Sequence, residues 1–217
     1  MGFNAESLLY NNDIKNVLHL GADRGGELPQ YAEMGVDKVV WIEANPEVYQ
    51  ELLDNLNIMN IDSVESLPYN QLITDQDDVL TEFNLYYNFD AGYLVGNKGM
   101  SSILKADPSW WGSGCYRGSI QLNSLTLDTF LERNNLGYNY DLLNMDIQGA
   151  ELMAIKHGTK LLENVKYINC EVTFYDLQYI NAPYYDELRD YFGLFGFTPV
   201  HTEMSAPNWG DVIFAKI

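Results

Sequence analysis

The sequence is short of cysteine, of basic residues and of long apolar runs, and each shortage disfavours a class of protein. Only two of the 217 residues are cysteine, Cys115 and Cys170, and neither belongs to a CxxC pattern. A disulfide scaffold and a cysteine-rich zinc site are therefore disfavoured. Lys and Arg number 12 against 31 Asp and Glu, which gives a formal net charge of −19. Such a surface repels phosphate backbones, so we expect no nucleic-acid partner.

Membrane and export signals are missing as well. No stretch reaches the roughly 18 consecutive apolar residues of a membrane span. Residues 1–10 lack a basic region followed by an apolar run, so no signal peptide is predicted. We therefore expect a cytoplasmic protein without a membrane span. The apolar share of 47% suffices for a core, and no linker or repeat divides residues 1–217, so one domain is expected.

Short apolar runs alternate with helix-like segments over most of the chain, which predicts an α/β sandwich with a mostly parallel sheet. The expected strands are 16–21, 38–43, 71–74, 140–145, 166–174, 197–202 and 211–216, and the expected helices are 27–34, a segment from residue 46, 149–162 and 184–195. The last two strands have no helix between them, so an antiparallel hairpin should close the sheet. Around residues 76–125 the alternation stops, and we expect a hairpin or loop insertion there.

A turn of small residues, GADRGG at 21–26, follows the first expected strand and would let the backbone approach a ligand closely. Its spacing is not GxGxxG, and no Gly-Lys-Ser/Thr follows, so neither the dinucleotide fingerprint nor the P-loop fits. Glu43 ends the second strand, about 20 residues after Gly21, where a carboxylate can accept from both ribose hydroxyls of an adenosine cofactor. From the spacing alone, a plain tight turn with a solvated Glu43 is an equal alternative.

A series of motifs in a fixed order resembles the FkbM-type methyltransferases. The motifs are HLGADRGGE at 19–27, WIEANP at 41–46, SS at 101–102, TLDT at 126–129, LNMDIQGAEL at 143–152, EV at 171–172, GF at 196–197 and WGD at 209–211. Many members carry Asp in place of His19 and Glu in place of Gln148. The resemblance implies a class I methyltransferase fold, which is a Rossmann-like sandwich with a seven-stranded, mostly parallel sheet and an antiparallel last strand. It also implies S-adenosylmethionine as the cofactor.

The resemblance and the strand ends together predict the contacts with this cofactor. Glu43 is expected to bind the ribose, and Asp75, after the expected third strand, is placed to accept from the adenine amino group. An ordinary turn acid is the alternative for Asp75, and Ser102 is included through the resemblance alone. His19 is expected to be a core imidazole rather than a ligand contact. The predicted cofactor-binding residues are Gly21, Ala22, Asp23, Gly25, Glu43, Asn45, Asp75 and Ser102.

Two carboxylates are the candidates for catalysis. A hydroxyl acceptor would benefit from a base or a metal ion that helps to remove its proton during methyl transfer. Asp146 ends a strand and, in the resemblance, lies near the methyl donor and acceptor; alternatively it orients the amino group of the cofactor. Glu171 lies in an otherwise apolar strand, so it should have a partner or a shifted pKa. Either residue could act as base or ligate Mg²⁺, and the sequence leaves the participation of Mg²⁺ open.

The acceptor follows only from the resemblance, which implies an O-methyltransferase acting on a hydroxyl of a sugar or glycan. Trp110 and Trp111, in the expected insertion, are candidates for an acceptor lid. The alternatives are a methyltransferase for a non-sugar hydroxyl or carboxyl, and a binding protein that has lost catalysis. A nicotinamide dehydrogenase would need a glycine pattern that the loop lacks.

Overall fold

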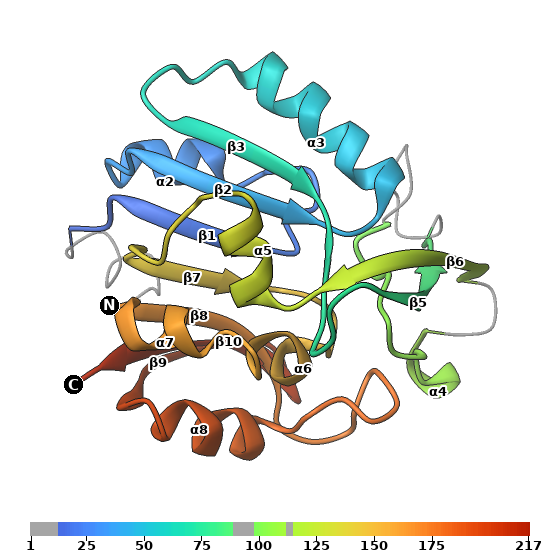
Figure 1. The fold of residues 1–217 in the computed structure, drawn as a ribbon. Coiled ribbons are helices and arrows are strands. Elements are labelled where there is room, and N and C mark those ends of the chain that lie inside the picture. Colours follow the sequence, from blue (N-terminus) through green and yellow to red (C-terminus); the bar gives the residue numbers. More distant parts are fainter. Residues whose placement is uncertain (1–12, 89–97, 112–114) are drawn as a thin grey trace.

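The computed structural model describes residues 13–88, 98–111 and 115–217, which form a central sheet covered by helices (Figure 1). The sheet has seven strands in the order β3-β2-β1-β7-β8-β10-β9. Neighbouring strands are parallel except β10, which is antiparallel to both β8 and β9. This confirms the predicted α/β class and the closing hairpin. The strands are β1 (Asn16–Leu20), β2 (Lys38–Glu43), β3 (Glu65–Asn70), β7 (Leu142–Met145), β8 (Tyr167–Thr173), β9 (Phe197–Ala206) and β10 (Trp209–Lys216).

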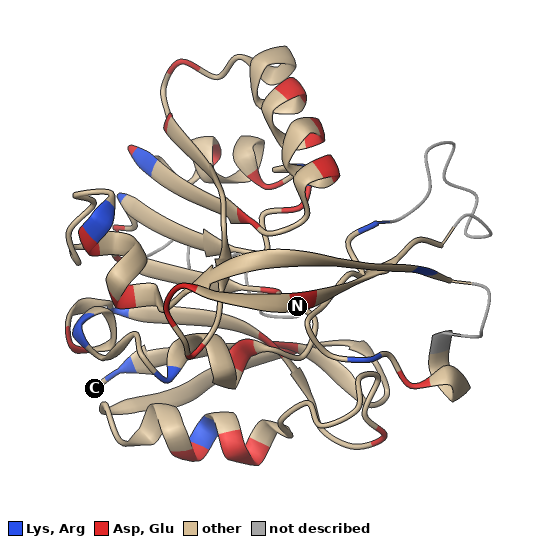
Figure 2. Cartoon of the chain, turned by 45° about the vertical axis from the view of Figure 1, so that its right-hand side comes forward, with Lys and Arg blue, Asp and Glu red and all other residues tan. Residues whose placement is uncertain are grey.

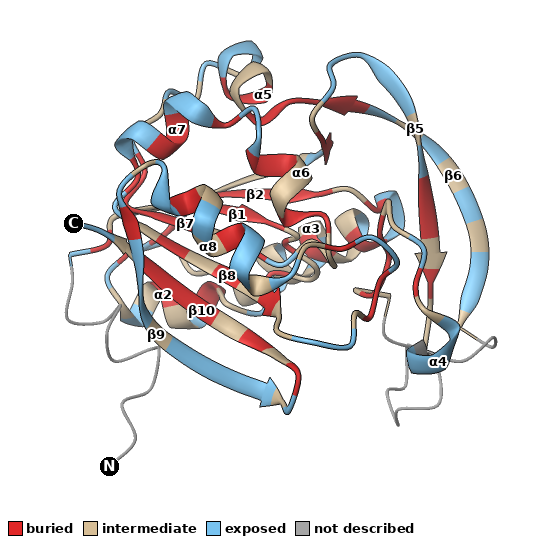
Figure 3. Ribbon diagram, turned by 90° about the horizontal axis from the view of Figure 1, so that it is seen from below, coloured by how far each residue is buried: buried red, intermediate tan, exposed pale blue. Residues whose placement is uncertain are grey.

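Helices lie on both faces of the sheet (Figure 3). One face carries α2 (Leu28–Glu33) and α3 (Pro46–Met59), and the other carries α5 (Leu127–Arg133), α6 (Glu151–Ile155), α7 (Thr159–Asn164) and α8 (Tyr185–Gly193). The predicted start of α3 is confirmed, because the Asn45 side chain accepts from the Glu47 N–H at 3.1 Å and Pro46 is the first helical residue. No described helix has the length and apolar character needed to cross a bilayer. Residues 1–10, where no signal peptide was predicted, lie outside the described residues.

The alternation of side chains along the strands builds one core on each face of the sheet. Leu18 and Leu20 of β1 belong to the core under α5–α8, together with Phe192. Val17 of the same strand and Trp41 of β2 belong to the other core, under α2 and α3. All five are at most 1% exposed, and burying each such side chain contributes roughly 1.5–3 kcal/mol to folding.

A smaller sheet lies beside the carboxyl ends of β1 and β2, in the region of the expected insertion (Figure 1). Its strands are β4 (Leu72–Ile73), β6 (Tyr116–Leu125) and β5 (Val79–Tyr86), in the order β4-β6-β5, and β5 pairs antiparallel with β6. The short helix α4 (Pro108–Trp111) lies between β5 and β6 in the chain. Residues 89–97 and 112–114 of the expected insertion lie outside the described residues.

Two predicted elements were wrong. The third strand of the main sheet is Glu65–Asn70, whereas residues 72 and 73 form β4 of the smaller sheet. β3 lies at the sheet edge and contains Pro68, so it lacks the apolar run that marks a buried strand. The single helix predicted for 149–162 is divided into α6 and α7, because the chain turns at Gly158, whose N–H donates to the Ile155 carbonyl at 2.9 Å.

Candidate functional site

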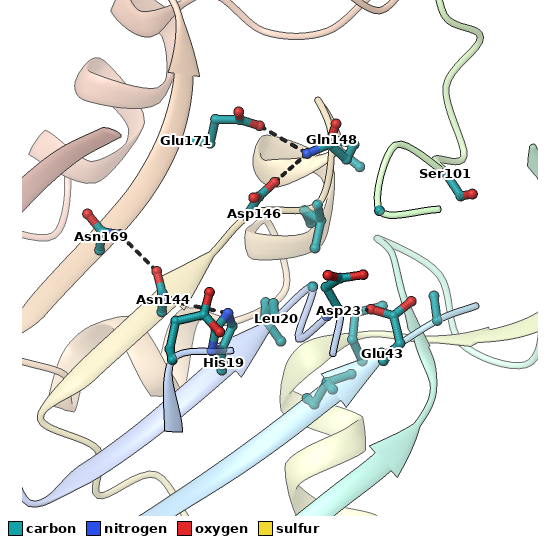
Figure 4. Close-up of a pocket in the computed structure, with 18 of the residues that line it drawn as sticks. His19, Leu20, Asp23, Glu43, Ser101, Asn144, Asp146, Gln148, Asn169 and Glu171 are labelled. Carbon is teal, nitrogen blue, oxygen red and sulfur yellow. Dashed lines mark hydrogen bonds between the residues drawn. The ribbon is translucent and has the colours of Figure 1, made fainter. Parts of the chain in front are cut away.

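A cavity of about 760 Å³ opens at the carboxyl ends of β1, β2 and β7 (Figure 4). The strand order reverses at β1, and clefts at such a point are the usual ligand sites of α/β sheets. We divide its lining into two regions, with Asp146 between them. The loop region consists of Gly21, Asp23, Glu43, Gln71 and Leu72, and the sheet region consists of Asn169, Glu171, Glu203, Trp209 and Asp211.

The loop region depends on a backbone turn that only glycine allows. Gly21 has a φ of +79°, and a Cβ atom added there would lie 1.7 Å from the Asp146 carbonyl oxygen. The N–H groups of Gly21 and Ala22 donate to the Ile42 carbonyl at 2.9 and 3.1 Å. β1, β2 and β7 therefore end tightly together, and a ligand can approach the backbone at this point.

Glu43 at the end of β2 is buried and held by backbone N–H groups. Its Oε2 accepts from the Asp23 N–H at 3.0 Å, and its Oε1 accepts from the Asn45 N–H at 2.7 Å. When Glu43 is ionised, each carboxylate oxygen has a second lone pair, so it can still accept from two hydroxyls of a ligand in the cavity. Burial raises the pKa of Glu43 to about 8.

This raised pKa predicts how stability depends on pH. The ordinary pKa is 4.5, so between this value and about 8 the folded chain holds a proton that the unfolded chain has lost. The stabilisation is therefore greatest at low pH and is lost as the pH rises through this window, by at most about 1.4 kcal/mol per pH unit. Burial raises the pKa of Asp211 and Glu151 as well, so we expect Glu43→Gln, which cannot ionise, to make this fall shallower in urea unfolding series without abolishing it. Exposed Glu65 on β3 supplies the control, since Glu65→Gln should keep the wild-type slope; the same slope in both variants would contradict the prediction.

Asp146 and Glu171 approach each other across β7 and β8 with the amide of Gln148 between them (Figure 4). Gln148 Nε2 donates to Asp146 Oδ1 at 2.5 Å and to Glu171 Oε2 at 3.3 Å. Asp146 faces the open cavity, yet burial raises its pKa. Burial and the neighbouring Asp146 charge raise the pKa of Glu171 well above its usual range. The pair therefore holds a proton more readily than isolated carboxylates, which suits a base near neutral pH.

The sheet region is acidic across three adjacent strands. Asp211 of β10 lies directly opposite Glu171 of β8 on one side and Glu203 of β9 on the other. Like charges at opposed positions oppose folding, and burial raises the pKa of Asp211 to about 6. Trp209 of β10 adds an aromatic face to this region. The region offers mainly hydrogen-bond acceptors, and such a lining suits a ligand rich in donors.

Lys98 is the one Lys or Arg among the described residues that line the cavity. Its ammonium nitrogen lies 3.1 Å from Glu47 Oε2 and 2.8 Å from Glu51 Oε1, both on α3. The charge of Lys98 is thus compensated by these two carboxylates and is directed away from the sheet region.

His19 belongs to a buried polar row beneath the cavity. The Tyr31 hydroxyl lies 3.2 Å from His19 Nδ1, and Asn144 Nδ2 lies 3.3 Å from His19 Nε2. Asn144 Oδ1 in turn accepts from Asn169 Nδ2 at 2.9 Å. Burial lowers the pKa of His19, which keeps the imidazole neutral. His19 is thus a hydrogen-bonded core imidazole, as predicted, although it also borders the cavity.

The cavity brings together half of the predicted site residues. Those that line it are Gly21, Asp23, Glu43, Asp146 and Glu171. Those outside the lining are Ala22, Gly25, Asn45, Asp75 and Ser102.

Most of the residues outside the lining support it from behind. Ala22 is 1% exposed in the core, and a Cβ atom at Gly25 would lie 2.7 Å from Leu52 of α3. Asn45 caps α3 and donates to Glu43. The Ser102 hydroxyl donates to the Gln148 carbonyl at 2.8 Å.

Asp75 and Trp110 are also absent from the cavity lining. The position of Asp75 was predicted from a third strand that ends at residue 74, but β3 ends at residue 70. Gln71 and Leu72 follow β3 directly and line the loop region instead. Trp110 on α4 is 43% exposed and is absent from the cavity lining, so it does not form a lid in this structure.

Sequence reasoning missed several lining residues that the strand period could have revealed. Asn144 lies two residues before Asp146, and Asn169 lies two residues before Glu171, so each pair shares one face of its strand. The sequence marks Gln148 only as a difference from many FkbM-type members, whereas its amide contacts both carboxylates. No signal in the sequence indicated that contact.

Most of the chain is similar to known methyltransferases. A family model described as "Methyltransferase FkbM domain" matches residues 19–199. A search of curated proteins found no match. TrmK of M. capricolum, solved with S-adenosyl-homocysteine, is similar with a TM-score of 0.55 and 8% identity, covering 100% of this chain and 69% of that one. Magnesium protoporphyrin IX methyltransferase (ChlM) of Synechocystis PCC 6803, solved with bound SAM, gives 0.54 and 10%, covering 98% and 76%. At these identities the likeness shows a shared fold.

Proposed function

Since the chain belongs to the FkbM methyltransferase family, we propose that it transfers the methyl group of S-adenosylmethionine to a hydroxyl of a sugar or glycan. The observation that best supports this is the content of one cavity. One end is lined by the turn at Gly21 and by Glu43, whose carboxylate can accept from ribose hydroxyls. The carboxylate pair Asp146 and Glu171 lies beside them. A binding site for the methyl donor and a base for the acceptor are thus adjacent.

The loop region fits the adenosine part of the cofactor. Glu43 would accept from the two ribose hydroxyls through the lone pairs that Asp23 and Asn45 leave unused. Leu72 and Ile147, which also line the cavity, offer apolar surface to the adenine ring. The cofactor supplies a methyl group that its sulfonium has already activated.

The chain's own residues would position the acceptor and receive its proton. The acceptor oxygen forms a bond to the methyl carbon while the carbon–sulfur bond breaks and its electron pair stays on sulfur. The hydroxyl proton passes to the Asp146–Glu171 pair, and the products are a methyl ether and S-adenosylhomocysteine. Holding the reactants in line contributes an effective molarity of about 10⁵ M or more.

The charge of the sheet region supports a hydroxyl-rich acceptor over a phosphorylated or carboxylated one. Glu171, Glu203 and Asp211 would accept from hydroxyls, and Trp209 would offer an aromatic face to a sugar ring. A phosphate or carboxylate would lie among these acidic groups without a free described cation in the lining, since Lys98 is bound by two glutamates. Over the rest of the chain, too, Lys and Arg residues are fewer than Asp and Glu residues (Figure 2).

Cofactor binding is tested by thermal unfolding with S-adenosylhomocysteine. At about 100 times Kd the ligand should add roughly 2.7 kcal/mol, which raises the midpoint by about 5–11 °C for a chain of this size. We expect Glu43→Gln to lose most of this rise and Glu65→Gln to keep it. NADH should give no rise; a larger rise with NADH would favour a dehydrogenase.

The acceptor is tested by measuring S-adenosylhomocysteine formed from S-adenosylmethionine with a panel of methyl glycosides, sugar phosphates, catechol and benzoate. We expect turnover with neutral glycosides and little with phosphates or benzoate. Turnover with catechol or benzoate alone would replace the sugar by a non-sugar acceptor. Cofactor binding without turnover on any acceptor of a broad glycoside library would favour the non-catalytic alternative.

A further inference from the structure

The side-chain amide of Gln148 lies between Asp146 and Glu171 and contacts both. Gln148 Nε2 lies 2.5 Å from Asp146 Oδ1 and 3.3 Å from Glu171 Oε2, so one nitrogen serves both carboxylates (Figure 4). An amide nitrogen carries two N–H donors and cannot ligate a metal ion. Its place between the two oxygens is the one that a divalent cation shared by the pair would need.

The opposite end of the amide is held away from the carboxylates. Gln148 Oε1 and the Met100 carbonyl oxygen lie 2.8 and 2.7 Å from the Tyr179 hydroxyl, so the two oxygens share its one proton. A reversed amide would put Oε1 against Asp146 Oδ1, which is unfavourable while the carboxylate is ionised. The side-chain oxygen of Gln148, which could ligate a cation, is therefore turned to Tyr179.

The backbone at Gln148 adopts an uncommon conformation that surrounding hydrogen bonds hold in place. Gln148 and Gly149 have φ values of +57° and +88°, and a left-handed glutamine is uncommon. Ser102 donates to the Gln148 carbonyl at 2.8 Å. Buried Glu151 accepts from the N–H groups of Ile147 and Gly149 at 3.1 and 3.2 Å. The surrounding structure thus fixes a strained turn that places the amide over the carboxylate pair.

The residues present do not fit Mg²⁺ at this pair. Mg²⁺ requires near-octahedral oxygen ligands at about 2.0–2.1 Å and is commonly held by one or two carboxylates together with waters, so at this pair it would need the position that the Gln148 nitrogen occupies. Within residues 13–88, 98–111 and 115–217 no group of three or more His, Cys, Asp or Glu side chains could hold a metal ion. We propose that the amide nitrogen of Gln148 takes the place of a divalent cation between Asp146 and Glu171. Gln148 is then a positioning residue, and the pair works without a bound metal.

The first test measures metal binding and does not depend on the proposed methyl transfer. Mn²⁺ is titrated into the wild-type chain and followed by its electron paramagnetic resonance signal. We expect no Mn²⁺ site that depends on Asp146. Binding by the wild type that Asp146→Asn abolishes would overturn the proposal, because Mn²⁺ would then have displaced the amide.

The second test replaces the amide by a carboxylate. Gln148→Glu removes the N–H donors and adds a third carboxylate, so we expect Mn²⁺ affinity at least tenfold above that of the wild type. The gain should vanish in the double variant Gln148→Glu/Asp146→Asn. Gln76→Glu adds the same charge at an exposed position and should bind Mn²⁺ as the wild type does. A folded Gln148→Glu that still gives the S-adenosylhomocysteine shift but gains no Mn²⁺ affinity would overturn the proposal.

A third measurement rests on the proposed function and separates positioning from plain structure. We expect Gln148→Glu and Gln148→Met both to turn over slowly, and Mn²⁺ to restore turnover only in Gln148→Glu. Wild-type turnover should be unchanged by a chelator. Equal turnover in the wild type and Gln148→Met would overturn the positioning role, whereas an absence of turnover in the wild type would refute only the proposed function.

Discussion

Replacing Asp146 by asparagine is expected to lower kcat for methyl transfer by about 10²–10⁴-fold, which is the range for losing a positioned base. Asparagine has nearly the same shape and can still accept from Gln148 Nε2, so the fold and the cavity should be retained. What is lost is the ability of the pair to take the acceptor proton. The measurement is the rate of S-adenosylhomocysteine formation at saturating acceptor.

The same variant distinguishes the two roles open to Asp146. If Asp146 is the base, Asp146→Asn should keep the thermal shift caused by S-adenosylhomocysteine. If it binds the amino group of the cofactor, that shift should fall while kcat changes little. Glu203→Gln removes a carboxylate on the outer strand of the sheet region and should change kcat by only a few-fold. A wild-type kcat in Asp146→Asn would exclude the role of base.

Replacing Gly21 by alanine is expected to destabilise the protein by about 3 kcal/mol or more, because backbone strain and a steric clash act together. The φ of +79° disfavours any residue with a Cβ atom, and this Cβ would lie 1.7 Å from the Asp146 carbonyl. The carbonyl is backbone and can yield only if the ends of β1 and β7 separate. At about 2–4 °C per kcal/mol the unfolding midpoint should fall by at least about 6 °C.

Gly137→Ala isolates the conformational part of this effect. Gly137 also has a left-handed φ, +67°, but a Cβ atom there would have no neighbour within 4 Å. Its replacement should therefore cost only about 1–2 kcal/mol and leave ligand binding intact. Equal losses in the two variants would show that the contact with Asp146 does not matter.

The sequence predicts the sheet well where a strand is buried on both faces. β1 and β2 read as apolar runs because helices cover both of their sides. β3 is an edge strand with a proline and few apolar residues, so its pattern is weak, and the adjacent run 71–74 predicts a strand more strongly. The predicted cofactor contact of Asp75 depends on a third strand that ends at residue 74. Because β3 ends at residue 70, Asp75 does not line the cavity.

The sequence by itself determined the fold class and the strand-end residues Gly21, Glu43 and Asp146, because apolar periodicity and turn glycines are local signals. The tertiary structure alone decided that Gln148 joins Asp146 to Glu171. That contact depends on the pairing of β7 with β8, on a left-handed turn and on Tyr179, 31 residues further along the chain. Such a contact depends on how elements that are far apart in the sequence pack against one another, and no local pattern of residues encodes it.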